Sequence, residues 1–218
     1  NDEDMLTVWA STQSPHFDQS GLAYVLRRDR STIRVIAPEV GGGFGGKAVR
    51  PGMVAACYAA IKLGRPIKFI EDRAENMVSY HGRGMSCQVD AAVKIDGTIL
   101  GLRFRTLCDI GAYFYRATPT PPYHMAHRIT GPYKTPVVHI EVRGVATNKP
   151  TTGPYRGAGG PEAAYFMERT IDVIASELGL DPTEVRRKNL IPEEAMPYIT
   201  PTGLTYDSGD YSNALQQA

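Results

Sequence analysis

The sequence predicts an α+β fold in which mixed sheets pack against helices, and three observations support this class. Residues 85–95 alternate between apolar and polar side chains up to the Asp96-Gly97 turn, and the alternation resumes at 100–106, which predicts a β-hairpin. Apolar residues recur every three or four positions over 164–178, which predicts an amphipathic helix. Upstream of the hairpin, short apolar runs alternate with helical segments, which adds further strands and helices.

Turn and capping residues set the bounds of the predicted elements. Pro15 and Pro51 suit the first position of a helix, where the missing N–H of proline costs no hydrogen bond, and Gly64 and Gly179 suit helix ends. The predicted strands are 6–10, 33–37, 67–70, 85–95, 100–106 and 137–146, and the predicted helices are 15–28, 51–63, 161–178 and 182–189. Long loops are predicted at 110–133 and 147–160, and an extended connector from 191 onward. The residues of the first helix that are expected to face inward are Phe17, Leu22, Val25 and Leu26.

Length, composition and charge exclude several classes of protein. The chain has 218 residues, 42% of them hydrophobic and 22% charged, as in ordinary globular proteins. This length suits one large domain or two small ones, and the prediction carried forward is a single domain over 1–218. A net charge of +1 argues against binding to nucleic acid or to an anionic membrane surface. No apolar run has the length of a membrane span. The three scattered cysteines, Cys57, Cys87 and Cys108, are expected to be reduced thiols in a cytoplasmic protein.

A glycine-rich stretch, GGGFGGK at residues 41–47, is the most unusual feature of the chain. Glycines have no side chain to pack and weaken any regular element, so they leave the backbone N–H groups open to close approach by another molecule. Phe44 is the single large side chain in the stretch. It either anchors the loop in the core or lines the surface that the backbone approaches.

This stretch also fits a dinucleotide-binding motif. Gly41, Gly43 and Gly46 match the pattern G-x-G-x-x-G, and Glu71 ends the next apolar run, where a ribose-binding acid could lie. Such motifs start their helix inside the glycine pattern, however, and Pro51 would then fall within that helix. Pro51 fits better as the first helical residue after a long loop.

A phosphate-binding P-loop is the second alternative, and an ordinary flexible loop the third. Gly41, Gly46 and Lys47 match G-x-x-x-x-G-K, but Ala48 lacks the hydroxyl that would bind Mg²⁺. Lys47 is therefore expected to anchor the loop rather than to bind phosphate. From these residues alone, a glycine loop without a ligand also remains open.

A second glycine-rich loop spans 153–160 and contains Tyr155 and Arg156. Because the glycines around Arg156 offer its side chain few packing neighbours, a polar partner is expected. Both this loop and 41–46 consist of backbone amides, an aromatic residue and little else. We therefore predict that the two loops converge at one exposed edge.

Other residues that carry polar or titratable groups are expected to have structural roles. His124 and His127 lie in the predicted loop 110–133, and we interpret them as ordinary loop residues. Glu162 and Glu168 begin the predicted helix after the second glycine loop. Helix capping or surface roles are expected for these two carboxylates.

Three segments in order resemble one family. GGGFGGK is followed by GPYRGAGGPEAAYFMER at 153–169 and by LGLDPTEVRRKNLI at 178–191, which resembles the molybdenum hydroxylase (xanthine oxidase and aldehyde oxidoreductase) family. The similar region is the first molybdopterin-binding domain of the large subunit, and the resemblance covers nearly the whole chain. GPYRGAGGPE resembles the aldehyde-oxidoreductase-like members that are often called carbon monoxide dehydrogenase large chain but lack the copper chemistry.

The resemblance implies a set of cofactor-binding residues. Gln13 would face the apical oxygen of the molybdenum, and the first loop would lie against the metal centre. The second loop would close the site near the pterin and the substrate. The implied cofactor-binding residues are Gln13, Gly42, Gly43, Phe44, Gly45, Tyr155, Arg156 and Gly157. The pterin sulfurs hold the metal in this family, so no protein ligand to the metal and no catalytic residue is expected in this chain.

Two departures from the family pattern narrow the expected activity. Purine hydroxylases have a glutamate where this chain has Ala48, and copper-containing carbon monoxide dehydrogenases have a cysteine where it has Gly157. The resemblance therefore implies oxidation of an aldehyde or a related carbonyl compound, with water as the oxygen source, and no copper.

The resemblance also implies cofactors and partners. The cofactor would be molybdenum with molybdopterin in its cytosine dinucleotide form, whereas FAD and 2Fe–2S clusters would lie in partner subunits. The general base would lie in a second molybdopterin-binding domain or chain, so this chain is expected to be a fragment that is inactive alone. The alternatives are a structural or assembly subunit without cofactor, and a nucleotide-binding α/β protein.

Overall fold

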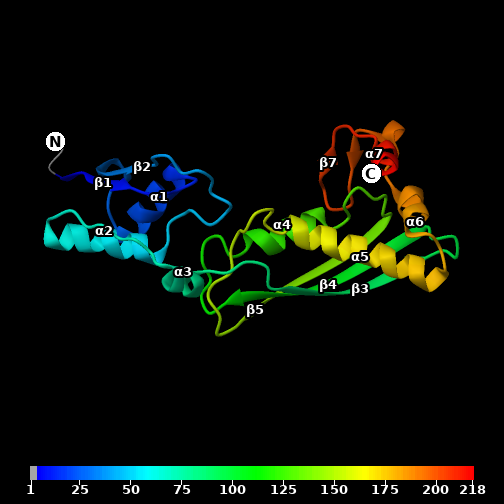
Figure 1. The fold of residues 1–218 in the computed structure, drawn as a ribbon, viewed down its shortest axis with the longest axis horizontal. Helices are drawn as coiled ribbons and strands as arrows, with labels where there is room; N and C mark the ends of the chain where they lie inside the picture. Colours follow the sequence, from blue (N-terminus) through cyan, green and yellow to red (C-terminus); the bar gives the residue numbers. More distant parts are fainter. Residues whose placement is uncertain (1–3) are drawn as a thin grey trace. The chain divides into compact units, whose positions relative to one another are not determined.

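The computed structural model describes residues 4–218, which form two compact units that meet between Tyr80 and His81. Whether the chain acts as the single domain expected from its sequence stays a prediction. The elements of the first unit are, in order, β1 (Leu6–Trp9), α1 (Pro15–Leu26), η2 (Arg30–Thr32), β2 (Ile33–Ile36), α2 (Pro51–Leu63) and α3 (Arg73–Ser79) (Figure 1). Strands β1 and β2 pair in parallel, with Leu6 opposite Ile33.

The core of the first unit is small. Leu22 of α1, Ile33 of β2 and Cys57 of α2 are its buried members. The prediction that Phe17 and Val25 face inward is wrong, because these side chains are 62% and 52% exposed. A sheet of two strands offers a narrow surface, so it covers a single stripe of α1 around Leu22.

Helix α2 begins at Pro51 and ends at Leu63, as predicted, with Gly64 at φ +62° as its C-cap. Helix α3 was not among the predicted elements. It begins with a capping box, in which the Asp72 carboxylate accepts the Glu75 N–H and the Glu75 carboxylate accepts the Asp72 N–H.

The strand predicted at 67–70 does not form. These residues have no regular structure, and Phe69 and Ile70 are 48% and 72% exposed. A strand needs a neighbour for its backbone hydrogen bonds, and no segment among residues 4–218 pairs with this one. An apolar run alone therefore gave a wrong prediction.

The second unit is built on one sheet. Its elements are β3 (Met85–Val93), β4 (Ile99–Gly111), α4 (Thr120–Arg128), β5 (Val137–Ala146), α5 (Gly160–Leu178), α6 (Pro182–Asn189), η3 (Glu193–Ala195), β6 (Tyr198–Ile199), β7 (Thr205–Tyr206) and α7 (Tyr211–Gln217). Strand β4 is central, antiparallel to β3 and parallel to β5. Helix α5 runs along one face of this sheet (Figure 1). The core between them includes Phe104, Met167 and Ile171.

The predicted hairpin is confirmed, with one local difference. Gly97 takes φ +84° in the turn, and Thr98 N–H donates to the Asp96 carboxylate. The pairing shifts between Ala92 and Val93, so Leu100 becomes an extra residue on β4. As a result Ile99 is buried, whereas Leu100, expected on the inner face, is 44% exposed.

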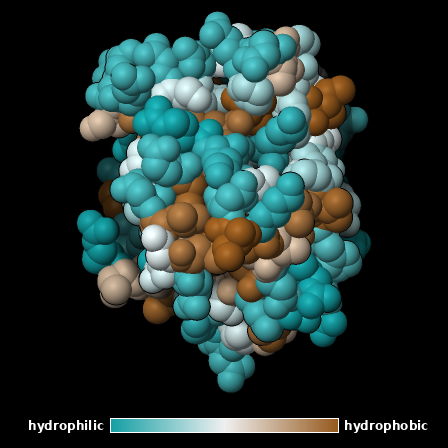
Figure 2. Space-filling view, turned by 90° about the vertical axis from the view of Figure 1, so that its right-hand side faces the viewer, coloured by the Kyte–Doolittle hydropathy of each residue, from teal (hydrophilic) through white to brown (hydrophobic). Residues whose placement is uncertain are grey.

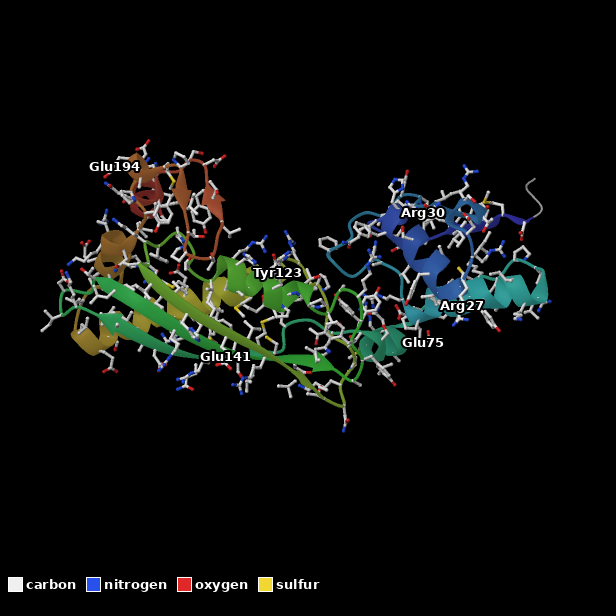
Figure 3. The ribbon with its side chains drawn as sticks, turned by 180° about the vertical axis from the view of Figure 1, so that it is seen from behind. Arg27, Arg30, Glu75, Tyr123, Glu141 and Glu194 are labelled. Atoms are coloured by element: carbon white, nitrogen blue, oxygen red, sulfur yellow. The ribbon has the colours of Figure 1, made fainter. Side chains whose placement is uncertain are left out.

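The sheet face opposite α5 is polar. Asp90 of β3 pairs with Arg103 and Arg105 of β4, and Glu141 of β5 pairs with Arg143. Glu141 is labelled on this face in Figure 3. The charges explain why β3 and β4 alternate so clearly in the sequence.

Two segments of the second unit are more ordered than predicted. Within 110–133, α4 begins beside Pro121 and buries Met125 against α5; prolines in a first helical turn were taken for loop residues. The segment from 191 is not an extended connector. Its β6–β7 hairpin is held to the unit by hydrogen bonds from Thr202 to the His127 carbonyl and from Tyr206 to the Gly131 carbonyl.

The surface of the molecule mixes apolar and hydrophilic residues. Apolar residues reach the surface among hydrophilic ones on the side of the molecule that carries α6 (Figure 2). Among residues 4–218, no helix has both the length and the apolar character that crossing a membrane requires.

Candidate cofactor-binding loops

The first glycine loop, residues 41–46, adopts backbone conformations that favour glycine. Gly41, Gly42 and Gly45 have φ values of +71°, +140° and +85°, and Phe44 itself has φ +51°. The Phe44 ring lies over Gly42, where a Cβ would come within 2.6 Å of a ring carbon. Because Phe44 is 57% exposed, it does not anchor the loop in the core, and of the two alternatives it fits the surface-lining one.

Gln13 inserts its side chain into this loop. The side-chain Oε1 of Gln13 accepts the Gly45 N–H at 3.0 Å. The backbone N–H of Gln13 donates to the Lys47 carbonyl at 2.9 Å. A Cβ on Gly43 would lie 2.4 Å from the Cβ of Gln13, so only glycine fits there. Gln13, Gly43 and Gly45 therefore form one local unit, while their binding to a cofactor stays a prediction.

The ends of the loop are held by cations and by one buried acid. Lys47 Nζ donates to the Val40 carbonyl, and Arg50 donates to the Gly46 carbonyl. Lys47 is therefore a loop anchor, as expected. Asp18, 2% exposed, accepts the Val49 N–H at 3.0 Å. The roles of Asp18 and Arg50 were not predicted, although an acid four positions before the buried Leu22 was a usable signal.

The geometry weakens both nucleotide-binding alternatives. Helix α2 starts at Pro51 and not inside the glycine pattern, unlike a dinucleotide-binding turn. The Glu71 carboxylate accepts hydrogen bonds from Asn76 and Ser79, so it is engaged within its own segment. Lys47 is engaged with its own loop and is followed by Ala48.

The open side of the first loop has the groups that a polar cofactor requires. The backbone N–H groups of Gly42 and Gly43 have no hydrogen-bond partner among residues 4–218, and neither has Nε2 of Gln13. A Cβ on Gly41 would meet nothing within 4 Å. Donors without partners beside bare backbone fit a large group rich in acceptors.

The second glycine loop, residues 153–160, also contains left-handed backbone. Gly157, Ala158 and Gly159 have φ values of +94°, +40° and +92°. A Cβ on Gly159 would lie 2.1 Å from the Pro121 carbonyl oxygen, because the loop passes close to the start of α4. Tyr155, Arg156 and Gly157 are exposed.

A short segment before β3, residues 81–84, holds the second loop. The His81 N–H donates to the Thr151 carbonyl, and the Gly153 N–H donates to the His81 carbonyl, both at 3.1 Å. Arg83 contacts the loop residues Tyr155 and Arg156 directly. This segment was not predicted, because its residues become neighbours of the loop only through the fold.

Asp109, near the end of β4, contacts residues of the segment that leads into the same loop. It accepts hydrogen bonds from the Thr147 hydroxyl at 2.6 Å and the Gly111 N–H at 2.9 Å, and Lys149 Nζ lies 2.9 Å from its Oδ2. Burial alone would raise the pKa of Asp109, but the hydrogen bonds from Thr147 and Lys149 outweigh it and lower the pKa to about 2.

We expect the Asp109 carboxylate to stabilise the fold on the order of 1–2 kcal/mol near neutral pH. Its folded pKa lies below the unfolded value of ~3.9, so this stabilisation is complete above that value and is lost as the pH falls toward 2. Asp109→Asn should therefore lower the free energy of unfolding at pH 7, and the difference from wild type should shrink on acidification. Denaturant unfolding at several pH values measures this, with exposed Asp207→Asn as the control. If the difference in unfolding free energy between wild type and Asp109→Asn stayed the same at low pH, the stabilising role of the Asp109 carboxylate would be contradicted.

Glu162 and Glu168 of α5 each have an arginine partner. Glu162, with a side chain 10% exposed, lies 3.4 Å from Arg83. Glu168 accepts the Tyr133 hydroxyl at 2.8 Å and pairs with Arg186 at 2.8 Å. Burial, together with Glu168, raises the pKa of Tyr133.

His127 is also structural. Its Nδ1 lies 3.1 Å from the Thr202 carbonyl oxygen. The centre of the Tyr123 ring lies 4.3 Å from the centre of the His127 ring, and the two rings are tilted by 55°. His124 and His127 are part of helix α4 and not of a loop. Tyr123, 62% exposed, is labelled on α4 in Figure 3.

Neither glycine loop lines the groove of about 680 Å³ between β3 and α5, which is bordered by residues such as Val89 and Phe166. Among residues 4–218, no group of three or more His, Cys, Asp or Glu side chains could hold a metal ion. The loops, rather than a cavity or a metal cluster, are therefore the candidate site.

Comparison with known proteins decides the family. A family model described as the molybdopterin cofactor-binding domain matches residues 1–190. The chain belongs to this family. It is 41% identical over 217 residues to the carbon monoxide dehydrogenase large chain of Hydrogenophaga pseudoflava, covering 97% of this chain and 27% of that protein. It is 34% identical over 223 residues to the nicotine 6-hydroxylase large subunit of Paenarthrobacter nicotinovorans, covering 98% and 26%.

Solved structures agree with this family. Quinoline 2-oxidoreductase from Pseudomonas putida 86 matches with a TM-score of 0.91 at 35% identity, over 98% of this chain and 28% of that one. Reconstituted CO dehydrogenase from Oligotropha carboxidovorans matches with a TM-score of 0.90 at 36% identity, over 98% and 27%. The α+β class predicted from the sequence is confirmed. The molybdopterin-binding chain thus spans about a quarter of the length of the relatives it matches.

Proposed function

We propose that this chain is part of the catalytic subunit of a molybdenum-dependent oxidoreductase, in which both glycine loops bind the molybdopterin cofactor. The observation that carries the proposal is the first loop, where Gly42, Gly43 and Gln13 present donors without partners on a backbone free of side chains. The match to the molybdopterin cofactor-binding family supports molybdopterin as the ligand of this loop.

The residues of this chain have separate tasks in the proposal. When bound, the molybdenum cofactor supplies two-electron redox chemistry and activates water as the oxygen source. The Gly45 N–H fixes the carbonyl end of Gln13, which leaves Nε2 to donate toward the cofactor. The exposed Phe44 ring forms an apolar wall that excludes water. Tyr155, Arg156 and Gly157 bind from the second loop, and the base is supplied from outside this chain.

We further propose that the substrate is an aldehyde or a related carbonyl compound. Two of the relatives are carbon monoxide dehydrogenase large chains, and one matching structure is a Cu,Mo-CO dehydrogenase. This chain has Gly157 after Tyr155-Arg156, so it offers no thiolate for copper at that position.

The finer parts of the proposal concern the assembly. We infer the cytosine dinucleotide form of the cofactor, a second molybdopterin-binding domain or chain, and partner subunits with FAD and 2Fe–2S clusters. The relatives are a large chain and a large subunit by name, which supports a complex of several subunits. Three free cysteines among residues 4–218 support a cytoplasmic location.

Metal and pterin analysis of the complex purified from its native host tests the function. We expect molybdenum and pterin in equal amounts, and no copper above background. Absence of molybdenum and pterin would favour a structural or assembly subunit. Tight, sub-micromolar binding of NAD or ATP would favour the nucleotide-binding alternative. Copper equal to molybdenum would contradict the substrate assignment.

A further inference from the structure

Arg83 has a backbone conformation that few arginines adopt. It lies between Gly82 and Gly84 with φ +60°, in the left-handed region that is unfavourable for residues with a long side chain. Such a conformation persists when surrounding contacts hold it. Among residues 4–218, the hydrogen bonds, the ion pair and the ring contact of the Arg83 side chain involve the second glycine loop or the helix that follows it.

The guanidinium group of Arg83 contacts three residues at once. One nitrogen donates to the Arg156 carbonyl at 2.6 Å, and another lies 3.4 Å from the Glu162 carboxylate. The guanidinium carbon lies 4.9 Å from the centre of the Tyr155 ring, within the range of a cation–π contact. One side chain thus joins the exposed part of the loop to the first turn of α5.

The residues before Arg83 also contact the second glycine loop. A Cβ on Gly82 would lie 2.8 Å from the Tyr155 Cβ, so Tyr155 packs directly on bare backbone. The backbone of His81 forms two hydrogen bonds to the segment 151–153: its N–H donates to the Thr151 carbonyl, and its carbonyl accepts the Gly153 N–H. Arg83 therefore extends from a segment that is itself hydrogen-bonded to the base of the loop.

We propose that Arg83 is a positioning residue, which sets the direction in which the second loop presents Tyr155 and Arg156 to the cofactor. The proposal rests on the proposed function of that loop. Arginine suits the role because its planar group can stack on a ring while its separate N–H groups bond to a carbonyl and a carboxylate. Lysine keeps the charge and can donate hydrogen bonds, but it has no planar group to stack on the ring.

Hydrogen–deuterium exchange of the assembled complex tests the structural half of the proposal. In Arg83→Ala, we expect amides of residues 153–160 to exchange ~10-fold faster, the factor that corresponds to losing one charge-assisted hydrogen bond. Peptides of β4 and β5 should be unchanged. Arg187→Ala, which removes an arginine paired with Glu184 on α6, is the matched control. Unchanged exchange in the loop would overturn the proposal and leave the proposed function intact.

Pterin content and kinetics test the functional half. In Arg83→Ala we expect reduced pterin retention and a kcat ~10-fold lower, since misplaced groups at a reaction centre lose rate steeply. Arg83→Lys should fold even if the alanine variant does not, and should be intermediate in both exchange and kcat. Faster exchange with unchanged pterin content and kcat would overturn the link to the cofactor, and would count against the second loop as part of the site.

Discussion

Gly45→Val is expected to lower turnover of the assembled complex at least ~100-fold, the scale at which reacting groups are displaced by about 1 Å. Gly45 has φ +85° and donates its N–H to Oε1 of Gln13. A β-branched residue disfavours this backbone conformation. Relaxing it would turn the N–H away and release Gln13, while the new side chain would occupy the space proposed for the cofactor. Steady-state kinetics of the purified complex, with subunit composition checked by gel filtration, measure the effect.

Gly64→Val is the matched control for this variant. Gly64 ends α2 with φ +62°, and a Cβ there would meet nothing within 4 Å. Both substitutions impose similar backbone strain, but Gly64 lies outside the glycine loop. We expect an intact complex in both cases and near wild-type turnover in the control alone. If Gly45→Val also turned over normally, the first loop would not lie at the reaction centre.

The elements that were predicted well are those whose bounds depend on local chemistry. Pro51 and Gly64 delimit α2, and Gly179 ends α5, because proline and glycine restrict or permit backbone angles wherever they occur. The geometry around Gln13 was not predicted from local chemistry. Its resemblance to a known family indicated the residue, and the structure brings it to Gly45.

Two of the failures concern features that depend on distant partners. Residues 67–70 have the composition of a strand, but strand formation requires a second strand that local sequence does not reveal. Arg83 contacts Glu162, which is 79 positions away, so no spacing rule connects the two. The predicted convergence of loops 41–46 and 153–160 depends on how the two units are placed, and it stays a prediction.

The 218-residue chain alone, supplied with cofactor, is expected to fold but to show no aldehyde oxidation. Hydroxylation needs a general base, which must be free to take a proton at the reacting centre. Asp18 accepts the Val49 N–H through Oδ1 and is only 2% exposed, so it is enclosed away from a substrate. Glu162 pairs with Arg83, and Glu168 pairs with Arg186. Glu39, before the first loop, is exposed and lacks the enclosed setting that tunes a catalytic acid or base.

The assay compares the isolated chain with the complete complex, using an aldehyde and an artificial electron acceptor. Circular dichroism and thermal unfolding establish that the isolated chain is folded, so that inactivity is not mistaken for unfolding. Under the proposed function, the complete complex should oxidise the aldehyde under the same conditions, because it would add the second cofactor-binding domain that is proposed to supply the base. Turnover by the isolated chain would show that a base lies among its own residues, and Glu39→Gln would then be the first variant to examine, since Glu39 is the exposed carboxylate preceding the first glycine loop.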